Sequence, residues 1–387
     1  METLNENIFD ESSYFTTWAT VVSNAFTPKV NLSNNSLRQI VHVSASGNNI
    51  RLKLSNKEGK TNLEIKEINI ADSKSQGSGE IDTNTIAYLT FKGEKEIIIP
   101  PEQEIYTDTI SYNLKPLSEI SISIYFGITP DILTGHNSSR THSFIEEGNG
   151  ISNEKFSIKS KKHKKACWYF ISAIEVSSLP IKKTIICFGD SITDGSGSTI
   201  DKQNRWVDLL SNKIHLNKDT SDIAVINKGL SGSRITANGI QIFSNDVLKI
   251  KGVAYIIALI GINDINSDMN SSQIISAYKQ IIEEAHKNNL FIYAGTILPY
   301  GNSKKWNKER EIVRQEVNNW IRNTKSENGG FDAIFDFDKL MKDPNDETKM
   351  FKEYDRGDGL HPSPEGHKKI AEAIDNLELF TKTFIKI

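Results

Sequence analysis

The chain has 387 residues, of which 37% are hydrophobic and 25% are charged, and its formal net charge is −3. This length favours two domains, and the mild negative charge argues against nucleic acid or an anionic membrane surface as the main partner. Two cysteines, Cys167 and Cys187, are too few for a disulfide framework or a thiolate zinc site. No run approaches the roughly eighteen consecutive apolar residues of a membrane span, and the N-terminus lacks the layout of a secretory signal. We therefore expect a cytoplasmic protein with no membrane partner.

The N-terminal region, from about residue 37 to residue 176, has the period-two pattern of β-strands. Short runs of alternating or β-branched residues are separated by turn formers. Many short strands at regular spacing predict a β-sandwich or jelly roll without a long helix. The runs lie at residues 40–43, 50–54, 63–65, 68–70, 86–91, 97–99 and 120–124.

Two polar segments of this region invite a functional interpretation. Segment 135–142 contains His136 and Arg140, which either bind an anionic or sugar substrate, or line a neighbouring cleft, or belong to a plain polar connection. Arg234, further along the chain, is a third possible substrate-binding residue. The basic run 159–165 is interpreted as a solvated hairpin tip, because a single basic run in a mildly acidic chain is weak support for polyanion binding.

After a linker at residues 177–180 the pattern changes to apolar runs that alternate with helical periodicity. Strand and helix alternating at this spacing predict βαβ units and a parallel sheet covered on both faces. The sequence thus predicts an all-β sandwich or jelly roll at residues 1–180 and a doubly wound α/β domain at residues 181–387. The expected strands are 185–188, 223–226, 253–260, 290–297 and 331–335, and the expected helices are 205–216, 240–248, 271–287, 306–324 and 364–377.

Polar residues follow several of the expected parallel strands where each strand ends. The first strand leads directly into Gly189-Asp190-Ser191, at the sheet edge where open α/β folds place their ligand sites. Taken alone, Ser191 is either a helix N-cap or a nucleophile. Further polar loops at 227–234, 261–264 and 358–362 fall at the same edge, which favours a functional site over a set of unrelated turns.

These residue types fit acyl transfer through Ser191. A serine hydroxyl needs a base within hydrogen-bond reach, and His361 is the best-placed histidine. Asp358, three residues earlier, can fix the tautomer of the imidazole and stabilise its charged form. The backbone N–H groups of Ser191 and Gly232 and the side-chain amide of Asn263 are suitable donors for the oxyanion.

Other residues of these loops receive simpler interpretations. Asp190 and Asp264 are expected to brace their loops, and His367 to be a solvated surface residue in a Lys-rich helix start. The glycine-rich segment 195–198 lacks both Gly-Lys-Ser/Thr and Gly-x-Gly-x-x-Gly, which argues against nucleotide binding. No histidine and carboxylate cluster has metal-ligand spacing, so we expect neither a metal nor a cofactor.

Four blocks of the C-terminal region resemble those of the SGNH, or GDSL, hydrolase superfamily. The resemblance implies a flavodoxin-like fold with Ser191 as the nucleophile. It also implies that Gly232 and Asn263 complete the oxyanion hole, and that Asp358 and His361 complete the catalytic triad. The first block ends in Ile rather than the commoner Leu, a conservative change. The blocks are Gly189-Asp190-Ser191-Ile192, Gly229-Leu230-Ser231-Gly232, Gly261-Ile262-Asn263-Asp264 and Asp358-Gly359-Leu360-His361.

A β-sandwich before an SGNH domain is also similar to the layout of microbial carbohydrate esterases that deacetylate xylan. The favoured hypothesis is therefore a serine esterase that removes acetyl groups from sugars or xylo-oligosaccharides. Two alternatives stay open: a short-chain arylesterase or lysophospholipase, and a carbohydrate-binding protein with an inert hydrolase domain. The expected partner is a small ester, and the sequence predicts no oligomeric state.

Overall fold

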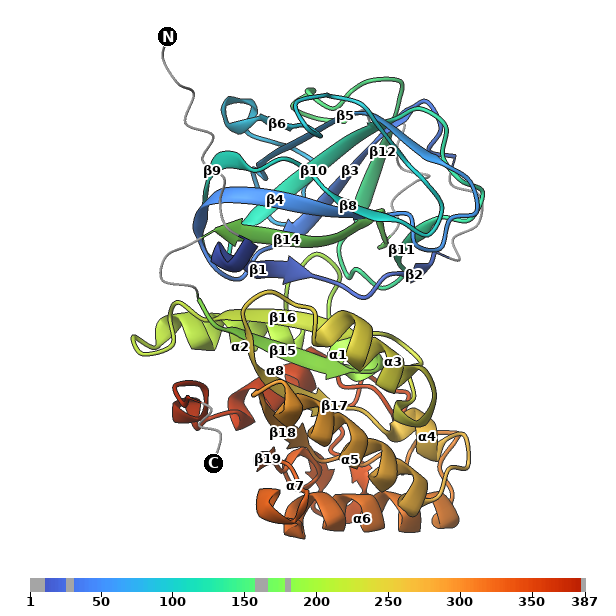
Figure 1. Ribbon diagram of the computed structural model, residues 1–387. Helices are drawn as coiled ribbons and strands as arrows, with labels where there is room; N and C mark the ends of the chain where they lie inside the picture. The colour runs from blue at the N-terminus through green and yellow to red at the C-terminus, as the bar shows by residue number, and fades with distance from the viewer. Residues whose placement is uncertain (1–10, 26–30, 157–165, 178–181, 384–387) are drawn as a thin grey trace.

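The computed structural model describes residues 11–25, 31–156, 166–177 and 182–383. Antiparallel sheets form the N-terminal part of the chain, and a parallel sheet with helices forms the C-terminal part (Figure 1). The predicted order, an all-β region before a doubly wound α/β region, is confirmed. The proposed boundary at residues 180 and 181 and the whole basic run 159–165 lie outside the described residues. No helix in the described ranges is long and apolar enough to cross a membrane.

Two large antiparallel sheets and one small one build the N-terminal part, and a shared cluster of buried apolar side chains fills its interior, as in a β-sandwich. The first sheet contains β1 (Tyr14–Ala19), β14 (Ile171–Ser177), β4 (Gly47–Ser55) and β8 (Glu104–Tyr106) in that order, with β9 (Ile110–Leu114) also paired to β4. The second contains β12 (Ser143–Glu147), β3 (Asn35–His42), β10 (Glu119–Phe126), β5 (Leu63–Asp72) and β6 (Ala87–Leu89), with β7 (Ile97–Ile99) paired to β5. The small sheet contains β13 (Trp168–Tyr169), β11 (Thr134–His136) and β2 (Ser23–Asn24).

The runs 63–65 and 68–70, which the sequence pattern separates, belong to the single strand β5. Pairing with β10 shifts register here, because Glu67 opposes Tyr125 while Ile65 opposes Phe126. This β-bulge changes the phase of the alternation, so the apolar residues on both sides of it face the core. A break in period two is therefore a bulge here and not a turn.

The parallel sheet has the strand order β16-β15-β17-β18-β19, formed by Ala224–Gly229, Thr184–Gly189, Val253–Leu259, Phe291–Gly295 and Ala333–Phe335. This is the flavodoxin-like order, with the first strand inside the sheet. Helices pack on both of its faces (Figure 1). They are α1 (Ser191–Asp194), α2 (Trp206–Leu216), α3 (Ile240–Ile242), α4 (Ile262–Ile265), α5 (Ser271–Lys287), α6 (Lys308–Asn323), α7 (Phe337–Met341) and α8 (Pro364–Ala373), and a hairpin of β20 (Lys342–Asp343) and β21 (Asp346–Met350) follows α7.

Most of the expected helices agree with the structure to within a few residues. Helix α5 has the predicted bounds, because Asn270 and Gln273 form a capping box at its start. The helix expected at 240–248 is instead one α-helical turn, α3, between two π-helical turns at Ile235–Gly239 and Phe243–Val247. A π-helical turn has i→i+5 hydrogen bonds, and each of these turns is only five residues long, which is too short for its altered period to show in the sequence pattern.

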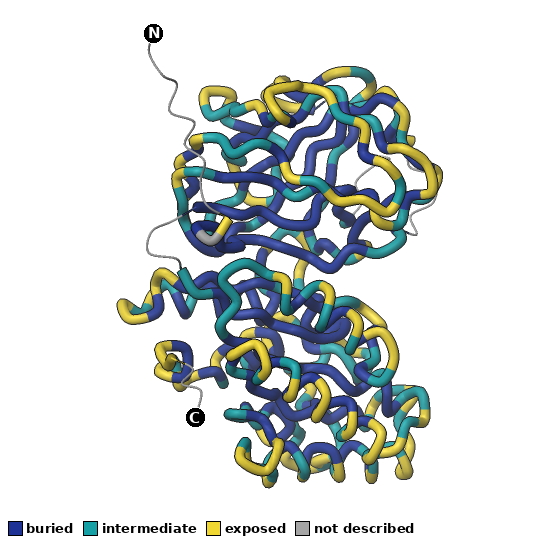
Figure 2. The backbone as a smooth tube through the Cα atoms, viewed as in Figure 1, coloured by how far each residue is buried: buried dark blue, intermediate teal, exposed yellow. Residues whose placement is uncertain are grey.

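The two parts of the chain are in contact along β16. Figure 2 shows buried backbone, in dark blue, where the two parts meet. Strand β1 lies beside β16, and all six of its residues are buried. Ser44 Oγ accepts a hydrogen bond from the amide of Val225 at 2.8 Å. The buried Lys228 donates to the carbonyl of Thr20 at 2.8 Å, and burial lowers the pKa of its ammonium group to about 8. The N-terminal part is thus packed against the edge strand of the parallel sheet.

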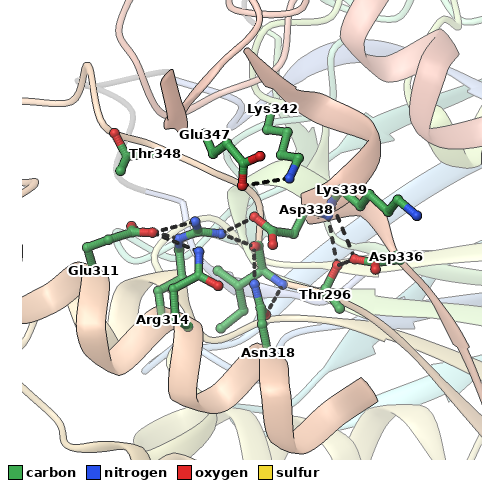
Figure 3. A network of polar contacts seen from close by, with 12 residues as sticks. Thr296, Glu311, Arg314, Asn318, Asp336, Asp338, Lys339, Lys342, Glu347 and Thr348 are labelled. Atoms are coloured by element: carbon green, nitrogen blue, oxygen red, sulfur yellow. Dashed lines mark hydrogen bonds and ion pairs between the residues drawn. The ribbon is translucent and has the colours of Figure 1, made fainter. Parts of the chain in front are cut away.

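A buried polar network fixes the segment that leaves β18 (Figure 3). Arg314 on α6 is fully buried and donates to the carbonyl of Ile297 at 2.9 Å, to Glu311 at 2.6 and 2.9 Å, and to Asp338. Asn318 binds both the amide and the carbonyl of Ile297, at 2.8 and 2.9 Å. A buried guanidinium is tolerated because carboxylates and carbonyls receive its N–H groups. The chain beyond β18 therefore starts from a fixed position.

Candidate active site

The turn after β15 presents Ser191 at the first position of α1. Gly189 is required in this turn, because a Cβ there would lie 2.4 Å from the carbonyl oxygen of Leu259. Asp190 caps the helix by accepting from the amide of Ile192 at 3.0 Å, as its predicted bracing role requires. Burial, reinforced by the charges of nearby carboxylates, raises the pKa of Asp190 to about 7.

Ser191, His361 and Asp358 form a continuous chain of hydrogen bonds. The Ser191 hydroxyl lies 2.9 Å from Nε2 of His361, and Nδ1 of His361 lies 2.8 Å from Oδ2 of Asp358. The second carboxylate oxygen of Asp358 accepts from the amides of Leu360 and His361 at 3.0 and 2.9 Å. Burial opposes ionisation of Asp358, but these hydrogen bonds outweigh it and lower its pKa. The structure thus brings together the three residues singled out in the sequence.

The loop that carries Asp358 and His361 is held by close packing. Gly359 has a positive φ of 72°, and a Cβ there would lie 2.2 Å from the backbone of Asn302. Arg356 adds an ion pair to Asp358, with Nε 2.9 Å from Oδ2. Arg356 was not among the residues predicted from the sequence, although its position two residues before Asp358 was an available signal. The carboxylate therefore has fixed partners on both sides.

The loops after β16 and β17 meet beside the serine. The amide of Leu230 donates to the carbonyl of Gly189 at 3.1 Å, and the side-chain amide of Asn263 donates to the carbonyl of Ser233 at 3.1 Å. Gly232 has a φ of 84°, and no atom lies within 4 Å of where its Cβ would be, so this face of the loop is open. Asp264 accepts from the amides of Ile235 and Thr236, both at 2.9 Å, as its bracing role requires.

The three possible substrate-binding residues lie in different environments. Arg140 donates from Nη2 to the hydroxyl of Ser196 at 2.9 Å, so it reaches the loop that follows the nucleophile helix. Arg234 is partly exposed in the loop after β16. His136 is only 2% exposed, and both of its ring nitrogens have protein partners, Val21 and Asp194. His136 therefore presents no free nitrogen to a substrate, and the structure does not support that role for it.

The prediction that His367 is a solvated surface residue is wrong. Its imidazole is fully buried at the start of α8. Nε2 lies 3.1 Å from the carbonyl of Ser196, and Nδ1 accepts from the amide of Trp206 at 3.3 Å. Burial lowers the pKa of His367 to about 4, so the ring is neutral at neutral pH. The lysines beside it in the sequence face solvent while His367 faces inward.

Residues 185–374 match the family model described as GDSL-like Lipase/Acylhydrolase. The C-terminal domain belongs to this family. The match therefore shows that residues 185–374 form an ester hydrolase domain, called the GDSL domain below. Among the described residues, no group of three or more His, Cys, Asp or Glu side chains could hold a metal ion.

Solved structures similar to the GDSL domain include a lipase/acylhydrolase from Enterococcus faecalis, with 21% identity over 53% of this chain and 100% of that one, and a TM-score of 0.43. A lipolytic protein of the G-D-S-L family from Desulfitobacterium hafniense has 22% identity over 50% of this chain and 97% of its own, with a TM-score of 0.40. A third, from Veillonella parvula, has 21% identity over 52% of this chain and 99% of its own, with a TM-score of 0.39. A comparison with curated proteins gives no match.

Proposed function

We propose that this protein is a serine esterase that removes acetyl groups from acetylated saccharides. The observation that carries the proposal is the unbroken series of hydrogen bonds from the Ser191 hydroxyl through His361 to Asp358. A serine activated in this way attacks carboxylic esters. Membership of the GDSL domain in an acylhydrolase family supports the same reaction.

In the proposed reaction the Ser191 hydroxyl attacks the acetyl carbonyl while its proton passes to Nε2 of His361. The tetrahedral intermediate then breaks its bond to the sugar oxygen, which leaves with the proton from His361. Water attacks the acetyl-enzyme while its proton passes to Nε2 of His361. The second tetrahedral intermediate then breaks its bond to the Ser191 oxygen, which takes the proton back from His361, and acetate is released. Ionised Asp358 holds the Nδ1 proton of His361 and stabilises the imidazolium in both steps.

The oxyanion is proposed to bind the amides of Ser191 and Gly232 and the side chain of Asn263. Ser191 begins α1, where the first N–H groups have no partner within the helix. Within the described residues, the amide of Gly232 donates to no other part of the chain, and its α-carbon faces open space. Loss of one such donor typically lowers the rate by about 10²–10³.

A sugar is proposed as the leaving alcohol because the loops around Ser191 are polar. Arg140 from the sandwich reaches Ser196, Arg234 is partly exposed beside the oxyanion loop, and Arg356 lies beside Asp358. Such donors match the hydroxyl and ring oxygens of a saccharide better than a long acyl chain.

The deciding experiment compares hydrolysis of p-nitrophenyl esters of increasing acyl length with acetate release from acetylated xylan and xylo-oligosaccharides. We expect activity to peak at acetate and to include acetylated oligosaccharides. A maximum at long acyl chains would instead indicate a lipase or lysophospholipase, and activity restricted to aryl acetates an arylesterase. Ser191→Ala serves as the control and should abolish every activity. If the wild-type protein is folded but has no esterase activity, the alternative of a carbohydrate-binding protein is favoured.

A further inference from the structure

A second histidine–carboxylate pair lies at the C-terminal end of the nucleophile helix α1. His136 is the last residue of β11 in the sandwich, and Asp194 is the last residue of α1. Nε2 of His136 lies 2.8 Å from Oδ1 of Asp194, and the exposed fractions of the two residues are 2% and 1%. The pair therefore joins the two parts of the chain within one helical turn of Ser191.

Both ring nitrogens of His136 have buried partners. Nδ1 lies 2.8 Å from the carbonyl oxygen of Val21, which can only accept, so Nδ1 carries a proton. Burial disfavours ionised Asp194, but the charge and hydrogen bond of His136, together with a hydrogen bond from Ser231, outweigh it and lower the pKa of Asp194. The imidazole ring is therefore fixed between a backbone carbonyl of the sandwich and the carboxylate at the end of α1.

The other carboxylate oxygen of Asp194, Oδ2, binds the loop after β16. Oδ2 accepts from the amide of Ser231 at 3.0 Å and from its hydroxyl at 2.5 Å. This loop also packs tightly on α1, because a Cβ at Gly229 would lie 2.2 Å from the amide nitrogen of Asp194. Ser231 directly precedes Gly232, so Asp194 sets the distance between α1, which carries Ser191, and the loop that carries the second oxyanion donor.

We propose that His136 is a positioning residue for the esterase reaction, acting through Asp194 and Ser231 to align the oxyanion donors of Ser191 and Gly232. The proposal rests on the proposed function of Ser191 and Gly232. It makes the β-sandwich a part of the catalytic geometry, because the ring comes from β11 and its Nδ1 proton is held by Val21. His136 itself touches no substrate.

The test uses two substitutions of His136 in the full chain. In His136→Gln the side-chain amide nitrogen takes the place of Nε2 and still donates to Asp194. In His136→Asn the shorter amide reaches the carbonyl of Val21 and leaves Asp194 without this donor. Initial rates with p-nitrophenyl acetate give kcat and KM, and the fraction of competent enzyme is counted by the covalent reaction of Ser191 with diethyl p-nitrophenyl phosphate.

We expect His136→Asn to lower kcat per titrated Ser191 by about 10²-fold with little change in KM, because displacement of an aligned group by about 1 Å has this effect. His136→Gln should recover most of the loss. A purely structural role would lower the number of titrated sites and leave kcat per site unchanged in both variants, which would overturn the proposal. Equal losses in both variants would also overturn it, because the contact to Asp194 would then not matter.

Ser231→Ala gives an independent check. It removes only the hydroxyl that binds Asp194 and keeps the backbone N–H, and the residue is exposed, so the chain should fold. Ser231→Ala should lower kcat, and combined with His136→Asn it should lower kcat by less than the product of the two separate effects, because both act through Asp194. If the double variant loses kcat by the full product of the two separate effects, His136 and Ser231 do not act through Asp194, and the proposal is wrong. If the wild-type protein hydrolyses no ester at all, the proposed esterase function itself is wrong, an outcome that is distinct from any ratio between variants.

Discussion

The two histidine–aspartate pairs beside Ser191 have similar contact distances and different surroundings. In the pair Asp358–His361 the far nitrogen of the imidazole faces a serine hydroxyl, and the side chains are 35% and 16% exposed. In the pair Asp194–His136 the far nitrogen faces the carbonyl of Val21, and the side chains are 2% and 3% exposed. The ring of His361 can exchange its Nε2 proton with a hydroxyl, whereas the ring of His136 is fixed between two oxygen atoms that are not hydroxyl groups.

The atom that faces the second ring nitrogen therefore distinguishes the proposed catalytic base, His361, from the proposed positioning residue, His136. A hydroxyl can give its proton to the ring, whereas a carbonyl oxygen has none to give. The pair distance alone, 2.8 Å in both cases, would not distinguish them. The predictions below test this distinction in order of decreasing effect.

Asp358→Asn should lower kcat by up to about 10⁴-fold, because an amide does not hold the imidazole in the tautomer that accepts the serine proton. Initial rates with p-nitrophenyl acetate at saturating substrate measure the loss. Asp358→Asn should leave the denaturant midpoint close to that of the wild type, since this carboxylate is one-third exposed. A loss of tenfold or less would mean that another group orients His361.

Asp194→Asn should lower kcat through its contact with Ser231 and, unlike Asp358→Asn, should also have a large cost in stability. Asp194 is buried and binds both His136 and Ser231, and leaving a buried polar group without its partner typically costs about 1–3 kcal/mol. Urea unfolding followed by circular dichroism gives the change in unfolding free energy. A change well below about 1 kcal/mol, comparable to an exposed pair, would show that the buried contacts of Asp194 do not stabilise the fold.

The buried His367 provides a third case, in which the ring has no carboxylate and stays neutral. Its folded pKa is about 4, below the ordinary value near 6.5, so the unfolded chain binds more protons between these values. Stability from this group is therefore fully present above pH 6.5 and is lost as the pH falls towards 4, by roughly 3 kcal/mol in all. Unfolding free energies of the wild type and His367→Gln, measured across this range, should differ by an amount that grows with pH.

The contribution of Asp190 to stability changes with pH in the opposite direction, so in the wild type it partly cancels the contribution of His367. The pKa of Asp190 is raised to about 7 in the folded chain, so the folded state holds a proton that the unfolded state has lost. Its contribution is present at low pH and is lost as the pH rises towards 7. Asp190→Asn, which keeps a capping oxygen for Ile192, should therefore make stability rise more steeply with pH than in the wild type. An unchanged slope would show that Asp190 is ionised in the folded protein.

The smallest effect is expected for Arg234→Ala. If this guanidinium binds the sugar, kcat/KM should fall severalfold for acetylated xylo-oligosaccharides and by less for p-nitrophenyl acetate. The ratio of the two losses is the measurement. Equal losses would place Arg234 in loop structure and not in sugar recognition.

The sequence predicts the parallel sheet and the residues at its carboxyl edge well, because each polar block directly follows an apolar strand. Ser191, Asn263 and His361 could be located from such local patterns. His136 was also singled out, but as a substrate-binding residue, and its contacts could not be predicted because its partners Val21 and Asp194 are 115 and 58 residues away along the chain. Strand β1 was missed for a related reason: all of its residues are buried, so it has no polar-apolar alternation. His367 was misjudged because its lysine neighbours dominate the local pattern.

Strand β16 is an edge of the parallel sheet, and the contacts of β1 and Ser44 against it have a consequence for solubility. An uncovered edge offers free N–H and C=O groups to the strands of other molecules. Here the side chain of Ser44 receives the Val225 amide, while the opposite edge strand, β19, is only three residues long. The sandwich thus shields the longer edge from self-association, and a chain that began at residue 182 would present β16 as a template for aggregation.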